Sequence, residues 1–131
     1  MDPKVKIASD FMDALRKAEI EKMLTFLSEE VKIVGASGAH YGKPELEQYF
    51  SHYTPPYRDV KTVPVGTYTV GDTVILESVL NGVHVKEYMG VPPSNKPFSM
   101  PTLNVFEVKN DEIAAWRQYQ NIKILVDLSA T

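Results

Sequence analysis

Three histidines are the residues of this sequence that could carry acid–base or metal chemistry near neutral pH. His40, His52 and His84 are spread along the chain, and no two have the three- or four-residue spacing that places a pair of ligands on one element. We therefore expect no metal site. His84 lies in a strand-like region and would reach an internal pocket if that strand has no bulge at Asn81-Gly82. The catalytic residues stay unassigned, with His84 and Gln118 as the candidates.

Other reactive motifs are scarce. The chain has no cysteine, which excludes disulfides, thiolate zinc sites and cysteine nucleophiles. The stretch Gly35-Ala36-Ser37-Gly38 comes closest to a serine nucleophile elbow, yet it lacks the second spacing of that motif and is more typical of a loop. Phosphate-binding glycine patterns are absent, so nucleotide hydrolysis and dinucleotide cofactors are disfavoured. We expect no cofactor.

Neutral polar side chains alternate with large apolar ones in three strand-like segments. Because side chains on a strand repeat every two residues, one face of each segment combines both kinds of group. In chain order these faces contain Leu76, Ser78 and Leu80, then Met100, Thr102, Asn104 and Phe106, then Ala114, Trp116, Gln118 and Gln120.

Helices in the first half of the chain must position these strands. Apolar residues over Val5–Leu27 have helical spacing with a break around Ala18–Ile20, which predicts two consecutive amphipathic helices. A short strand is predicted over 31–37. Pro44 begins a third helix, which Pro55-Pro56 ends.

Strands dominate the second half. Gly71-Asp72 is predicted to join two long strands, and Lys109-Asn110-Asp111 to join the next two, with a loop over 90–97 between the hairpins. Helices that are segregated from strands indicate an α+β domain.

Composition and charge limit the class of protein. The 131 residues are 44% hydrophobic and 24% charged, as expected for one folded domain over residues 1–131. Fourteen basic and seventeen acidic side chains give a formal charge of -3 without a basic stripe, so nucleic acid is not an expected partner. We also expect no membrane partner and a cytoplasmic location, because no apolar run has the length of a signal peptide or a membrane span.

Several segments resemble the SnoaL-like, nuclear transport factor 2-like superfamily, which includes limonene epoxide hydrolase, polyketide cyclases and ketosteroid isomerase. They are Asp10–Val31, Tyr41-Gly42, Pro93-Ser94-Asn95-Lys96 and Asn110–Leu125, within a resemblance that runs from Lys6 to Leu128. The resemblance implies a cone-shaped, curved, mostly antiparallel sheet wrapped around three N-terminal helices, a cystatin-like α+β barrel. It also implies a deep internal pocket and, frequently, a homodimer across the sheet.

The catalytic residues of these relatives are not found at the matching positions. The Arg and Asp pair of the epoxide hydrolase and its further Asp correspond to Ser78, Leu80 and Gln118. The isomerase base falls within Ile33–Gly35, and the cyclase acid falls near Gln118 and Asn121. An amide cannot act as a general base near neutral pH and serves instead as a donor and acceptor.

The predicted ligand pocket combines residues from the helices and from the polar faces of the strands. Its lining is Met12, Leu15, Tyr53, Ser78, Leu80, Met100, Thr102, Asn104, Trp116, Gln118 and Gln120. This mixture of apolar and neutral polar groups suits a small, largely apolar ligand with a few oxygens. A simpler interpretation of Gln118 is that Ser78 or Asn104 satisfies it across the sheet, with no ligand involved.

The opposite face of the last two strands suits a homodimer interface. Leu103, Val105, Arg117 and Tyr119 share this face and mix apolar with polar groups.

Several functions fit these observations, because one fold hosts unrelated chemistries. The favoured one is a small-molecule-binding protein with isomerase- or cyclase-type activity on a small hydrophobic metabolite. That activity needs a titratable group in the cavity, for which His84, Lys32, Tyr53 and Glu87 are available. The alternatives are a non-catalytic binding or dimerisation module that lost the family's acids, an epoxide hydrolase-like enzyme with a replaced triad, and a protein adaptor.

Overall fold

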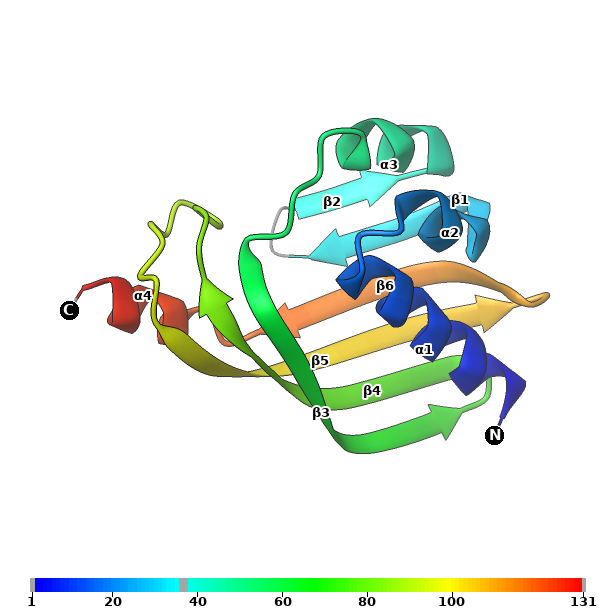
Figure 1. The fold of residues 1–131 in the computed structure, drawn as a ribbon. Coiled ribbons are helices and arrows are strands. Elements are labelled where there is room, and N and C mark those ends of the chain that lie inside the picture. The colour runs from blue at the N-terminus through cyan, green and yellow to red at the C-terminus, as the bar shows by residue number, and fades with distance from the viewer. Residues whose placement is uncertain (1, 36–37, 131) are drawn as a thin grey trace.

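One curved sheet with helices against its inner face makes up the fold (Figure 1). The computed structural model describes residues 2–35 and 38–130. Its elements are α1 (Pro3–Arg16), α2 (Ile20–Thr25), β1 (Leu27–Gly35), β2 (Gly38–Tyr41), α3 (Lys43–Phe50), β3 (Tyr57–Val70), β4 (Thr73–His84), β5 (Pro97–Lys109), β6 (Glu112–Gln120) and α4 (Lys123–Ser129). The strands lie in the order β2-β1-β6-β5-β4-β3, and all neighbours are antiparallel except β1 and β6. The predicted α+β class with a mostly antiparallel sheet is confirmed.

Helix α1 begins with a capped first turn. The Asp2 side chain accepts a hydrogen bond from the Lys4 backbone N–H at 2.8 Å. Pro3 lies in the first turn, where a backbone N–H would have no partner within the helix, so the missing N–H of proline does not destabilise it. Its buried face has one residue every three positions: Val5, Ala8, Phe11 and Ala14. This spacing lays α1 along the sheet.

The break between the first two helices lies at Ala18, as the sequence predicts. Ala18 has a φ of 55°, a left-handed conformation that is costly for any residue with a Cβ. Its N–H donates to the Leu15 carbonyl, and the Glu19 N–H donates to the Ala14 carbonyl. These bonds close the end of α1 and turn the chain into α2.

Both predicted hairpins are confirmed. Gly71 takes a φ of 58° in the turn from β3 to β4, while Asn110 and Asp111 have φ values of 52° and 61° between β5 and β6. Two successive left-handed residues make the tight turn that matches the twist of a hairpin.

Two short elements were not predicted. Strand β2 pairs with the end of β1, and α4 packs near β5 at the far end of the sheet. Strand β2 has four residues at an edge with little burial, and α4 has no side-chain cap at Ile122. Neither therefore has a strong local signal. None of the helices within residues 2–35 and 38–130 is long and apolar enough to cross a membrane.

Two apolar clusters hold the layers together. The larger joins α1, α2 and α3 to the sheet and contains Phe11. The Phe11 ring lies edge-on to the rings of Phe106 and Trp116, with distances between ring centroids of 5.8 Å and 5.0 Å. The smaller joins α4 and the 85–96 segment to the sheet through Leu125 and Phe98. The two clusters leave a space between them on the inner face.

Candidate functional site

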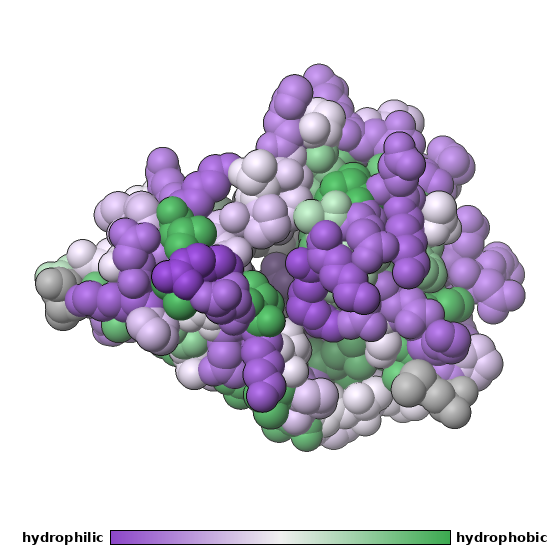
Figure 2. All heavy atoms as spheres, viewed as in Figure 1, coloured by the Kyte–Doolittle hydropathy of each residue, from purple (hydrophilic) through white to green (hydrophobic). Residues whose placement is uncertain are grey.

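A cavity of about 460 Å³ lies between α1 and the inner face of the sheet. Helix α1 contributes Val5, Ser9, Met12, Asp13, Leu15 and Arg16 to it. Strands β3, β4, β5 and β6 contribute the facing wall. Figure 2 shows the surface hollowed near the middle of this face, between α1 and β3. The volume is within the range of sites for small organic molecules.

Nine of the eleven residues predicted to line a pocket border this cavity. They are Met12, Leu15, Tyr53, Ser78, Leu80, Thr102, Asn104, Gln118 and Gln120. Met100 does not border it, because it is fully buried in the smaller apolar cluster. Trp116 does not border it either, because Phe11 covers its ring. Strand alternation placed both on the correct face but could not show which parts of that face other side chains fill.

A hydrogen-bonded amide pair lies on the sheet wall of the cavity. Asn104 on β5 and Gln118 on β6 are directly opposite each other in the strand register. Asn104 Oδ1 accepts from Gln118 Nε2 at 3.2 Å and from Trp116 Nε1 at 2.9 Å. Gln118 is thus partly satisfied across the sheet, as the simpler interpretation of that residue expects. Its other amide atom remains available to the cavity.

Three tyrosines border the cavity, of which only Tyr53 was predicted. The Tyr88 hydroxyl donates to Gln120 Oε1 at 2.9 Å, and burial raises the pKa of Tyr88 to about 12. Burial also raises the pKa of Tyr53 and, further, that of Tyr57. The three phenols therefore stay protonated at neutral pH, and each keeps a proton that it can donate in a hydrogen bond. The Tyr57 hydroxyl is buried and has no partner among the residues that the structure describes.

His84 lies beyond the cavity. Strand β4 pairs with β5 without interruption through Asn81 and Gly82, so no bulge of that pair turns His84 away from the inner face. The side chain is fully buried, however, and does not border the cavity, because the Tyr57 ring packs edge-on against it at 5.9 Å. Neither ring nitrogen has a hydrogen-bond partner within the described part of the chain. A direct catalytic role for His84 in this cavity is therefore unsupported.

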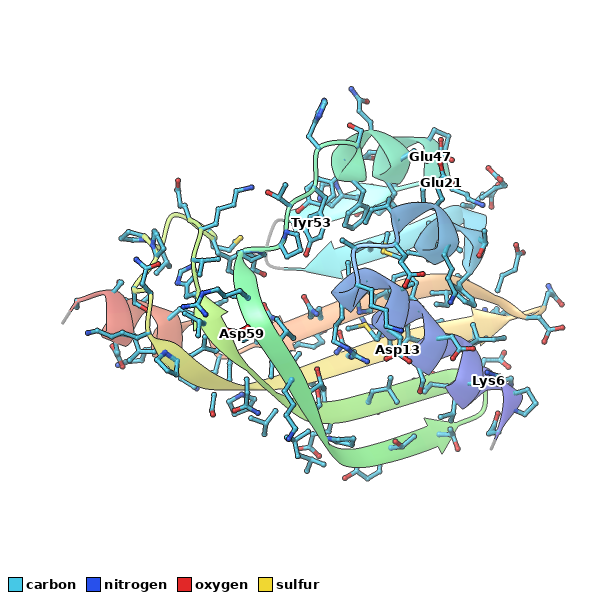
Figure 3. The ribbon with its side chains drawn as sticks, viewed as in Figure 1. Lys6, Asp13, Glu21, Glu47, Tyr53 and Asp59 are labelled. Carbon is cyan, nitrogen blue, oxygen red and sulfur yellow. The ribbon has the colours of Figure 1, made fainter. Side chains whose placement is uncertain are left out.

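Charged groups reach the cavity at Asp13, Arg16 and Glu77. Asp13 and Arg16 form an ion pair one helical turn apart on α1, and partial burial lowers the pKa of Arg16. Glu77 accepts a hydrogen bond from the Tyr68 hydroxyl at 3.3 Å. Asp13 on α1 and Tyr53, between α3 and β3, are labelled in Figure 3.

The other titratable candidates lie elsewhere. Lys32 and Glu87 are exposed and do not border the cavity. Ser37, the central residue of the elbow-like stretch, lies outside the described residues. Within residues 2–35 and 38–130, no three His, Asp or Glu side chains gather closely enough to hold a metal ion.

Comparison with known proteins identifies the family. Residues 8–116 match the model of the SnoaL-like domain, and no curated protein matches the sequence. A proposed SnoaL-like polyketide cyclase from Jannaschia sp. CCS1 has a similar structure, with a TM-score of 0.84 at 16% identity over 98% of this chain and 93% of the other. IdmH, a proposed polyketide cyclase from Streptomyces antibioticus, superposes over all of both chains with a TM-score of 0.77 at 18% identity.

A third similar structure illustrates how widely the fold is used. It is a hypothetical protein with a ketosteroid isomerase-like fold from Catenulispora acidiphila, in complex with trimethylamine. Its TM-score is 0.73 at 19% identity over 95% of this chain and 92% of the other. At such identities these likenesses show a common fold and leave the chemistry to the site. Because the family model spans most of the sequence, the chain belongs to the SnoaL-like domain family, with the nuclear transport factor 2-like fold.

Proposed function

We propose that this protein binds a small, neutral, largely apolar molecule with one or more oxygens in the cavity under α1. The observation that carries the proposal is the composition of the cavity wall. Met12, Leu15 and Leu80 supply apolar surface, while the Asn104–Gln118 pair supplies neutral hydrogen-bonding groups. Apolar surface with a few placed polar groups is typical of small-molecule sites.

The sheet wall favours binding over epoxide hydrolysis. Ser78, Leu80 and Gln118, which occupy the positions of the epoxide hydrolase triad, all border the cavity. A hydroxyl, an alkyl group and an amide cannot supply the acid–base pair of that reaction. The gathering of these three positions at one cavity therefore supports a ligand site without supporting that chemistry.

Saturable binding of neutral bicyclic ketones, measured by isothermal titration calorimetry, tests the proposal. We expect 2-acetylnaphthalene to bind the wild-type protein and to lose its binding in Ser78→Phe, whose ring would occupy the cavity. Ser51→Phe is the matched control, because Ser51 is exposed after α3 and does not border the cavity. Equal binding by the Ser78→Phe protein, or no saturable binding by the wild type, would contradict the proposal.

Isomerase- or cyclase-type turnover is a second candidate function, and the protonated tyrosines favour it. A phenol that donates to a ligand carbonyl stabilises the negative charge that develops on the oxygen when the neighbouring carbon loses a proton. In this scheme the proton moves to the Asp13 carboxylate, which borders the same cavity, and later returns to carbon. Tyr53 suits the donor role best, because the Tyr57 hydroxyl is fully buried and the Tyr88 hydroxyl already donates to Gln120 Oε1.

Deuterium exchange separates turnover from binding. In D₂O, the methyl group of bound 2-acetylnaphthalene should exchange faster with the wild-type protein than with Asp13→Asn, as followed by proton NMR. Asp127→Asn, a change at an exposed residue of α4, is the control and should exchange at the wild-type rate. Exchange that is equally fast with Asp13→Asn would remove Asp13 as the base while leaving ligand binding intact.

A further inference from the structure

Trp116 fixes the orientation of the amide pair on the cavity wall. An indole N–H can only donate, so the Asn104 atom that lies 2.9 Å from Trp116 Nε1 must be the amide oxygen. The Gln118 atom that lies 3.2 Å from the same oxygen must then be the amide nitrogen, because two oxygens would leave that contact without a proton. The polarity of both amides thus follows from one donor in the core.

Each amide keeps one unused group of opposite polarity. Asn104 Nδ2 has two N–H donors, and Gln118 Oε1 has two lone pairs. Neither has a partner among the residues that the structure describes. Both side chains border the cavity, and Asn104 is 3% exposed. Polar groups at such depth are usually satisfied, by protein, water or a ligand.

We propose that the cavity selects neutral molecules that carry a carbonyl acceptor and a hydrogen-bond donor side by side, as a carboxamide does. The ligand's carbonyl oxygen accepts from Asn104 Nδ2, and its adjacent N–H or O–H donates to Gln118 Oε1. Carboxamides and α-hydroxyketones have this arrangement. A carboxylate does not, because it has no proton to donate to Gln118 Oε1. This inference rests on the proposed binding function and names the class of ligand for the same site.

Two isosteric probes test the hydrogen bond that the ligand donates to Gln118 Oε1. In 2-naphthamide an NH₂ group replaces the methyl group of 2-acetylnaphthalene, so the two compounds share shape, neutrality and carbonyl acceptor and differ in one donor. With the wild-type protein we expect 2-naphthamide to bind about 2- to 10-fold more tightly, the range that one additional net hydrogen bond provides. The readout is the ratio of the two dissociation constants, measured by calorimetry.

Variants at Gln118 assign the effect to its oxygen. Gln118→Met keeps the length of the side chain but removes the acceptor, so the ratio should fall to about 1 while the ketone still binds. Gln48→Met makes the same change at an exposed position on α3 and should leave the ratio unchanged. Circular dichroism establishes that each variant is folded before its ratio is compared.

The outcomes separate this inference from the proposed function. Equal affinity of the wild-type protein for the two probes, or an unchanged preference in folded Gln118→Met, would overturn the inference while binding itself stands. If neither probe binds the wild-type protein, the proposed function fails, and the inference fails with it.

Discussion

The tyrosines at the cavity offer a sharp test, because the same substitution should have opposite effects at two of them. The Tyr57 hydroxyl is buried without a partner, whereas the Tyr88 hydroxyl donates to Gln120 Oε1 at 2.9 Å. The two rings lie 5.7 Å apart, in the same part of the protein. A change from tyrosine to phenylalanine removes one oxygen in each case and keeps the ring.

The expected magnitudes follow from the state of each hydroxyl. A buried polar group without a partner costs about 1 to 3 kcal/mol, so Tyr57→Phe should raise the free energy of unfolding by about 1 kcal/mol. For a chain of this length, that corresponds to an increase in Tm of roughly 3 to 5 °C. Tyr88→Phe removes a hydrogen bond and leaves Gln120 Oε1 without its donor, so it should lower the free energy of unfolding by about 1 kcal/mol.

Urea unfolding of the ligand-free protein measures both effects through the fluorescence of Trp116, the single tryptophan of the chain. The two variants should shift the midpoint in opposite directions. A loss of stability in Tyr57→Phe, or shifts of the same sign in both variants, would refute the reasoning.

Three further predictions concern the fold, its pH dependence and its assembly. Ala18→Gly should raise the free energy of unfolding by about 1 kcal/mol, because glycine adopts a left-handed φ without penalty; urea unfolding that shows no gain would contradict this account of the break. Burial raises the pKa of Tyr88 to about 12 and that of Tyr57 further, so the folded state keeps protons that the unfolded chain releases above about pH 10. The contribution of these two phenols to the free energy of unfolding is therefore complete below pH 10 and should be lost as the pH rises toward 12. A free energy of unfolding that stays constant over that range would refute the burial of these phenols. Tyr119 is 54% exposed on the outer face of the sheet, and we expect a homodimer there that Tyr119→Glu converts to monomer in sedimentation experiments; a monomeric wild-type protein would rule the interface out.

Periodicity explains why much of the cavity wall could be predicted from the sequence. Asn104, Gln118 and Gln120 are on one face because side chains alternate along each strand. The hairpin turn at 110–111 starts the pairing of the two strands, and a bulge at Glu107/Val108 then shifts the register so that Asn104 lies opposite Gln118. The same rule places His84 on that face, but it carries no information on which neighbours cover a residue. Burial by the Tyr57 ring decides that His84 lies outside the cavity.

The unpredicted residues depend on contacts between distant parts of the chain. Tyr88 lies in the segment between β4 and β5, and its position rests on a short bridge to Val91 and on its bond to Gln120. Tyr57 follows two prolines at the start of β3, where local pattern shows only that a strand begins. No period in the sequence links these positions, so their meeting at the cavity is visible only in three dimensions.

The amide pair bears on whether this protein is an enzyme that has lost its acids. A carboxylate at position 118 could not donate to Asn104 Oδ1, and its negative charge would face that oxygen at the distance now spanned by the 3.2 Å hydrogen bond. Asn104 in turn is oriented by Trp116, whose ring packs on Phe11 and stacks over Phe106 at 6.2 Å. The amides at the cavity are thus matched to one another and to a donor in the core. A chance loss of acids does not require such matching, whereas a site that recognises a ligand through fixed donors and acceptors does, and we therefore favour selective binding over a degenerate active site.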